Sequence, residues 1–148
     1  MDSEKLLQGE FRLFGEFNLL NFKNNPNKDL FKITGVYVLC LEEKFDRLLG
    51  KTDVLYIGQS GGAKGGKGRF IVERLTDYCV GAFSAPQDKR IHDAIEGISR
   101  KLKKKILIFY KNIKKDNCEQ EEQYLLKEFE IDHLELPPWN RQLPKSKL

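Results

Sequence analysis

Two charged residues occupy positions where the helical pattern calls for apolar side chains. Residues 69–79 repeat apolar residues at helical spacing, and Arg74 lies on the same stripe, one turn from Phe70 and one turn from Tyr78. Glu122 is placed in the same way on the apolar stripe of residues 118–132. Removing a guanidinium or a carboxylate from water is costly unless it is paired or binds a ligand. The two residues therefore form a buried structural salt bridge, lie at the edges of their stripes, or belong to a site.

A shared site with these two groups would suit phosphate chemistry. A carboxylate is a hard oxygen ligand for a divalent cation. A planar guanidinium matches the oxygens of a phosphate. Two tyrosines lie in neighbouring segments rich in β-branched and aromatic residues, Tyr37 in residues 32–41 and Tyr56 in residues 53–58. Aromatic residues favour strands, so neither tyrosine indicates a function by itself.

The elements that must position these residues follow from periodicity and turn residues. We expect strands over residues 32–41, 53–58 and 105–110, the first two pairing as a hairpin with a long loop. We expect helices over residues 69–79, 87–103 and 118–132, the last preceded by a cap at Asp116 or Asn117. The fold class is α+β, with a small mixed or antiparallel three-stranded sheet flanked by helices.

The first 30 residues are an irregular extension with too many apolar side chains to remain in water. We expect this segment, 1–30, to pack on the main domain, 31–148, with a short helix near its start. The extension ends in a turn at residues 24–27, where Asn, Asn, Pro and Asn follow one another.

Composition restricts the class of protein. The chain has 148 residues, enough for one domain with a core, and an apolar fraction of 40%. No stretch approaches the roughly 18 apolar residues of a membrane-spanning helix, and the N-terminus lacks the apolar run of a secretory signal. We therefore expect a cytoplasmic protein with no membrane partner. The three scattered cysteines, Cys40, Cys79 and Cys118, are expected to be buried free thiols.

Positive charge is clustered along the chain. The net charge is +4, and lysines gather in residues 101–105, in residues 111–115 and in the glycine-rich stretch 61–68. Such clusters suit a polyanion, although the same clusters often form only a solvated face. Charge alone leaves both interpretations open.

Five ordered segments resemble the GIY-YIG nucleases. They are the Gly-Val-Tyr run ending at Tyr37, the Tyr-Ile-Gly run from Tyr56, the Arg-Leu-Thr-Asp-Tyr run from Arg74 to Tyr78, the Glu-Gln-Tyr-Leu-Leu run from Glu122, and the Pro-Pro-Trp-Asn run ending at Asn140. Together these segments span residues 35 to 140, most of the chain. There are departures from the family: the first two motifs lie far apart, the loop before Arg74 is long and glycine-rich, and the interval from Glu122 to Asn140 is long. Glu128 would shorten that interval, but the stripe favours Glu122.

The resemblance implies a metal-dependent DNA endonuclease. Glu122 would hold Mg²⁺ or Mn²⁺, and Arg74 would hold a phosphate oxygen. Tyr37 would act as general base toward water with Tyr56 beside it, Tyr78 would contact the phosphate or the water, and Asn140 would tie the C-terminal segment to the site. A phenol of pKa about 10 would need a stabilised phenolate to act as a base near neutral pH.

DNA contacts are expected next to the second motif. Gln59 follows that motif where some family members have lysine, and the cations of the glycine-rich loop, Lys64, Lys67 and Arg69, could grip the DNA backbone. A homodimer would allow both strands to be cut. Restriction, repair and mobile-element roles all stay open.

Two other functions compete with the nuclease. The chain could be a non-catalytic DNA-binding module that retains the nuclease fold. The glycine-rich stretch also nearly matches a nucleotide-binding P-loop, with Gly61, Gly66 and Lys67 at the required spacing. Gly68, however, stands where that motif needs Ser or Thr to coordinate Mg²⁺.

Overall fold

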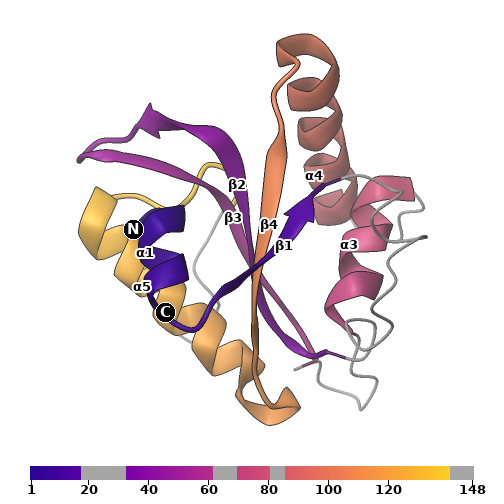
Figure 1. The fold of residues 1–148 in the computed structure, drawn as a ribbon, viewed down its shortest axis with the longest axis vertical. Coiled ribbons are helices and arrows are strands. Elements are labelled where there is room, and N and C mark those ends of the chain that lie inside the picture. Colours follow the sequence, from indigo (N-terminus) through magenta and orange to yellow (C-terminus); the bar gives the residue numbers. More distant parts are fainter. Residues whose placement is uncertain (18–32, 62–69, 81–85, 141–148) are drawn as a thin grey trace.

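A four-stranded antiparallel sheet separates two layers of helices (Figure 1). The computed structural model describes residues 1–17, 33–61, 70–80 and 86–140. The strands are β1 (Arg12–Glu16), β2 (Gly35–Asp46), β3 (Lys51–Ser60) and β4 (Ile106–Asn112), in the spatial order β1-β4-β2-β3. Helices α1 (Ser3–Gln8) and α5 (Cys118–His133) lie on one side of the sheet, and α3 (Ile71–Val80) and α4 (Pro86–Gly97) lie on the other.

Alternation along the strands creates a separate core on each face. On β2, Tyr37 and Leu39 join the cluster that contains residues of α3 and α4. Their neighbours Val36 and Val38 join the cluster that contains residues of α1 and α5. Both faces of β2 are thus covered, which explains why its first seven residues are all buried.

The expectation of three strands was wrong, because residues 12–16 add β1 at the outer edge of β4. This strand is short and carries a bulge between Leu13 and Gly15, so it shows no alternating sequence pattern. Its backbone hydrogen bonds with β4 hold it in the sheet. Residues 1–17 contain a short helix, α1, and contribute Met1, Leu6 and Phe11 to one of the two core clusters. The turn expected near residues 24–27 lies outside the described residues.

The hairpin of β2 and β3 is confirmed as antiparallel, but its loop is short rather than long. Both strands extend beyond their expected ends and leave only residues 47–50 between them. The added part of β2 carries charged residues, which argued against a strand. Tertiary contacts hold this part in place: Lys104 pairs with Glu43, and the Glu42 amide donates to the Lys105 carbonyl.

The helices agree with expectation except at their ends. The segment expected as one helix over 87–103 changes after Gly97 into a π-helical turn, Ile98–Leu102, and Leu102 is exposed instead of ending a buried stripe. At α5 Asn117 occupies the N-cap position as expected, but it does not cap the helix with its side chain. It is also the last residue of a 3₁₀ turn, Lys115–Asn117.

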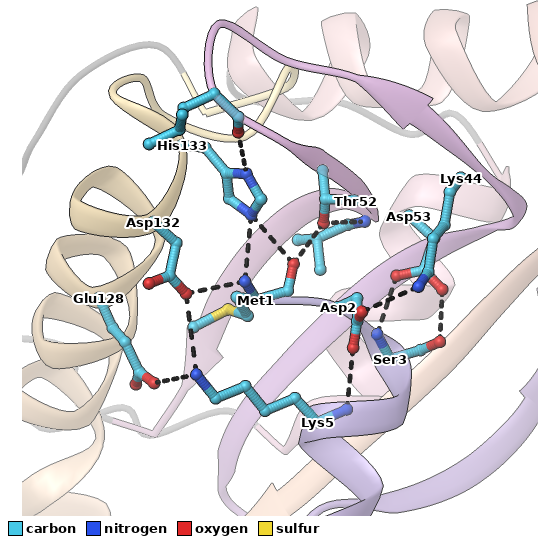
Figure 2. Close-up of polar contacts among 12 residues, drawn as sticks. Met1, Asp2, Ser3, Lys5, Lys44, Thr52, Asp53, Glu128, Asp132 and His133 are labelled. Carbon is cyan, nitrogen blue, oxygen red and sulfur yellow. Dashed lines mark hydrogen bonds and ion pairs between the residues drawn. The ribbon is translucent and has the colours of Figure 1, made fainter.

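Polar contacts attach the first residues to the hairpin and to α5 (Figure 2). The Met1 ammonium lies 2.7 Å from the Asp132 carboxylate, and the Thr52 hydroxyl donates to the Met1 carbonyl at 2.6 Å. The Ser3 amide donates to Asp53 at 2.8 Å. These contacts fix α1, and with it the start of β1, relative to the sheet.

The three cysteines are free thiols, with Cys40 and Cys118 buried and Cys79 only half-buried. In the parts of the chain that the structure describes, none of the helices has the length and apolar character needed to cross a membrane.

Candidate active site

Three tyrosines from three elements meet on the face of the sheet covered by α3 and α4. Tyr37 comes from β2, Tyr56 from β3 and Tyr78 from α3, and their ring centroids lie 6.3 to 6.4 Å apart. The hydroxyls of Tyr37 and Tyr78 are hydrogen-bonded at 2.8 Å. None of the three side chains is more than 4% exposed. Sequence reasoning placed all three in a site, and the structure brings them together.

A glycine makes room for this cluster. Gly58 is the register partner of Tyr37 on the neighbouring strand. A Cβ at Gly58 would stand 2.6 Å from both Cζ and the hydroxyl oxygen of Tyr37. The Tyr37 ring therefore lies directly across the Gly58 backbone, in space that a side chain would fill.

Arg74 projects from α3 into the same cluster. Its Nη2 donates to the Tyr78 hydroxyl at 3.1 Å, and its guanidinium carbon lies 5.3 Å from the centre of the Tyr78 ring. Arg74 also donates two hydrogen bonds to the Asp88 carboxylate, from Nη1 at 3.2 Å and from Nη2 at 3.0 Å. The suggested salt bridge between Arg74 and Glu122 is absent from the ion pairs of the described residues, in which Asp88 and Asp77 are the acidic partners of Arg74.

Sequence reasoning missed two residues of α4 in this site. Asp88 is buried beneath Arg74, and Gln87 donates from its side-chain amide to the Tyr56 hydroxyl at 2.9 Å. Both lie in the first turn of α4. An acidic residue is common there, because its negative charge is stabilised by the positive end of the helix dipole. The first turn therefore gave no sign that its side chains reach a neighbouring helix and strand.

Glu122 approaches from the other layer. It lies near the start of α5, on the opposite side of the sheet from α3 and α4. Its charge nevertheless acts on the tyrosine cluster: Glu122 raises the pKa of Tyr56, and Arg74 lowers the pKa of Glu122.

Burial sets the proton affinity of Glu122. Desolvation, with a smaller contribution from the neighbouring Glu119 carboxylate, raises the pKa of Glu122 to about 7. Among the described residues no hydrogen bond or ion pair to its side chain is found. Glu122 is thus a largely desolvated carboxyl group that titrates near neutral pH, and such groups concentrate at functional sites.

The pKa values of the buried phenols are raised, whereas a tyrosine that acts as a base near neutral pH needs a lowered pKa. Burial raises the pKa of both Tyr37 and Tyr56 well above 10, and the positive charge of Arg74 only partly opposes this. Both tyrosines are therefore neutral at pH 7 in this structure. The role of Tyr37 as a general base stays a prediction, one that needs further positive charge close to its oxygen.

Asn140 is attached to the strand that carries Tyr56. Its side-chain carbonyl accepts from the Ile57 amide, and its side-chain amino group donates to the Ile57 carbonyl, both at 2.9 Å. The Trp139 amide donates to the Leu55 carbonyl at 2.9 Å. Asn140 and Trp139 thus attach the C-terminal segment to β3 on either side of Tyr56 in the sequence.

The expected DNA contacts are only partly described. Gln59 is half-buried on β3 and is the register partner of Val36, which places it on the face that α5 covers, away from Tyr56. Lys64, Lys67 and Arg69 lie outside the described residues. The Nδ1 atom of His92, in α4, lies 2.6 Å from the Tyr78 carbonyl oxygen.

The raised pKa of Glu122 predicts a pH dependence of stability. In the unfolded chain the carboxyl group titrates near 4.5, and in the fold it titrates near 7. Between these values the folded protein binds the proton more tightly, so the stability contributed by this group is complete below about pH 4.5 and is lost as the pH rises through 7. The shift corresponds to at most about 3 kcal/mol.

The measurement is chemical denaturation of the native protein and of Glu122→Gln at pH 5 and pH 8. We expect the native protein to lose stability relative to the variant as the pH rises. Parallel pH profiles of the two proteins would show that Glu122 is not buried as described.

The donor set at Glu122 fits a hard divalent cation. The described residues contain no group of three or more His, Cys, Asp and Glu side chains arranged to hold a metal. One carboxylate, with Glu119 close enough to influence it, can hold Mg²⁺ when waters and phosphate oxygens complete the shell. A bound cation would pair directly with this carboxylate, which interacts with Arg74 only at longer range and has no ion-pair partner among the described side chains.

Comparison with known proteins gives no independent assignment. No family model matches the chain, and neither a curated protein nor a solved structure matches it.

Proposed function

We propose that this protein is a metal-dependent endonuclease of the GIY-YIG type that hydrolyses phosphodiester bonds in DNA. One observation carries the proposal. The residues of the five motifs are spread from position 37 to position 140, yet four of them form a connected cluster. Arg74 bonds to Tyr78, Tyr78 bonds to Tyr37, and Tyr56 packs against both of these rings. Glu122 is close enough for its charge to act on this cluster.

Each residue has a role that suits its environment. Arg74 is a fixed cation with part of its surface exposed, and it would bind a non-bridging oxygen of the scissile phosphate. Glu122 would hold Mg²⁺ or Mn²⁺, and a cation bound there supplies Lewis-acid polarisation of the phosphate and stabilises the leaving oxygen. The hydroxyls of Tyr37 and Tyr78 would orient the attacking water. Asn140 holds β3, and through it Tyr56, in place.

The water's proton must pass to a base, and the resemblance assigns this task to Tyr37. The tyrosine is neutral in this structure, because burial outweighs the attraction of Arg74. Both a bound cation and Arg74 carry the sign of charge that favours the phenolate. In this proposal Tyr37 therefore acquires its basicity only when the metal site is filled, because the cation must outweigh the negative charge of the phosphate bound at Arg74.

Asp88 is expected to act as a positioning residue for Arg74. Replacing Asp88 with asparagine keeps its shape but removes the charge that orients the guanidinium. We expect a roughly tenfold fall in cleavage rate with little change in DNA affinity, because the cation itself remains. Asp88→Glu should restore part of the rate. If both variants lost DNA binding and cleavage in parallel, Asp88 would have only a structural role.

The experiment that tests the proposal is nicking of supercoiled plasmid in Mg²⁺ or Mn²⁺, with EDTA as the control. We expect conversion to the open circular form only with metal. DNA binding without cleavage, across both metals and across linear, supercoiled and branched DNA, would identify a non-catalytic binding module instead. Absence of both binding and cleavage would overturn the proposal.

A further inference from the structure

A cavity of about 500 Å³ opens where β1 begins, at the outer edge of β4. Its lining combines apolar and polar residues from the N-terminal segment, from Ile33 two residues before β2, and from the end of β4. The lining residues are Gly9, Glu10, Phe11, Arg12, Ile33, Tyr110, Lys111 and Asn112, and the one carboxylate among them, Glu10, faces Lys111. An apolar wall for a sugar or base, together with cationic and amide groups for a phosphate, is the composition that a nucleotide requires.

The strand register connects this cavity to the tyrosine cluster. Arg12 is paired with Tyr110, Tyr110 with Tyr37, and Tyr37 with Gly58, so these four residues form one row across the four strands. Residues directly opposite each other in antiparallel strands share a face. At about 5 Å between strands, the Arg12 backbone lies roughly 10 Å from that of Tyr37, a distance of a few nucleotides along a DNA strand.

Arg12 is the cation of this cavity that is free to take a ligand. Lys111 is held by the Glu121 carboxylate at 2.9 Å and faces Glu10 at 3.6 Å, so its charge is already matched. Arg12 is exposed, and within the described part of the chain no hydrogen bond or ion pair to its side chain is found. Its backbone is fixed because β1 pairs with β4 and α1 is attached to the hairpin (Figure 2).

We propose that this cavity binds a nucleotide of the DNA strand that flanks the cleaved phosphate, with Arg12 binding its phosphate group. The inference rests on the proposed function and extends it, because it gives the N-terminal segment a part in substrate binding. The alternative is that Arg12 is a charged residue on an edge strand that only discourages pairing with other strands.

The test measures DNA binding in the Glu122→Gln background, in EDTA, so that cleavage does not interfere. Arg12→Gln removes one charge from the cavity. The matched control is Arg100→Gln, which removes one charge from an 80% exposed arginine in the π-helical turn after α4. Fluorescence anisotropy with a short duplex of about 20 base pairs gives the affinity and its dependence on salt for each variant.

We expect Arg12→Gln to weaken binding roughly tenfold near 0.1 M salt and to lower the slope of log affinity against log salt by about one, while Arg100→Gln changes neither. Equal behaviour of the two variants would overturn the inference and leave the proposed function standing. Absence of DNA binding by the parent protein would overturn the inference, and together with absence of nicking by the native protein in Mg²⁺ or Mn²⁺ it would overturn both. Circular dichroism of each variant verifies that the fold is retained.

Discussion

Glu122→Gln is expected to abolish metal-dependent cleavage, with a loss of about 10³-fold or more, and to leave the fold intact. The substitution keeps the shape of the side chain but removes the negative charge that would hold the cation. Because burial already raises the pKa of Glu122 to about 7, the neutral amide should be tolerated at least as well as the carboxylate at pH 8. Plasmid nicking in Mg²⁺ measures the activity, and thermal denaturation measures the fold.

The matched control is Glu128→Gln on the same helix. Glu128 contacts only the exposed Lys5 ammonium, at 3.9 Å, among the ion pairs of the described residues. Such a contact contributes little to stability. We expect this variant to cleave like the native protein. If Glu128→Gln lost activity while Glu122→Gln retained it, the metal ligand would be Glu128. Unchanged cleavage by both variants would remove α5 from the catalytic site.

Gly58→Ala is expected to disorder the tyrosine cluster and to reduce cleavage by about 10²-fold or more. The new methyl group would stand 2.6 Å from the Tyr37 ring and hydroxyl, so the ring must move and its hydrogen bond to Tyr78 must break. Tyr37 is 1% exposed and has no free space to enter. Overpacking of this kind costs about 1–3 kcal/mol of stability. Denaturant titration and nicking assays measure the two effects.

A second glycine provides the control for this substitution. Gly97 ends α4 in helical geometry, and a Cβ there would meet no atom within 4 Å. Gly97→Ala should therefore be neutral or stabilise the protein by up to about 1 kcal/mol, as alanine does in helices. If both alanine variants had native stability and activity, the Tyr37 ring would not lie across Gly58.

The sequence was most informative where a residue conflicts with its surroundings. Arg74 and Glu122 were identified because a charge on an apolar stripe is costly, and the structure places both in contact with, or close to, the tyrosine cluster. Tyr37 and Tyr56 could be interpreted only together with the other motifs, because aromatic residues are common in strands. Asp88 could not be assigned to the site from the sequence, because an acidic residue in the first turn of a helix is common and indicates no function.

The errors in the predicted fold share one physical cause. β1 and the outer half of β2 are held by contacts with residues distant in the sequence, and their own composition is not typical of strands. Their stability comes from β4, which provides the hydrogen-bonding edge for β1, and from Lys104 and Lys105, which contact the charged end of β2. Local periodicity contains no information about such partners.

The side chain of Asn140 has a consequence for solubility. At Ile57 it occupies both backbone hydrogen-bonding groups of an edge strand, as a residue of a fifth strand would. Trp139 occupies the Leu55 carbonyl in the same way. Exposed edges are where sheets of different molecules join and aggregate. The same asparagine that fixes the strand of Tyr56 thus also blocks the growth of the sheet, so its loss would favour self-association as well as a disordered site.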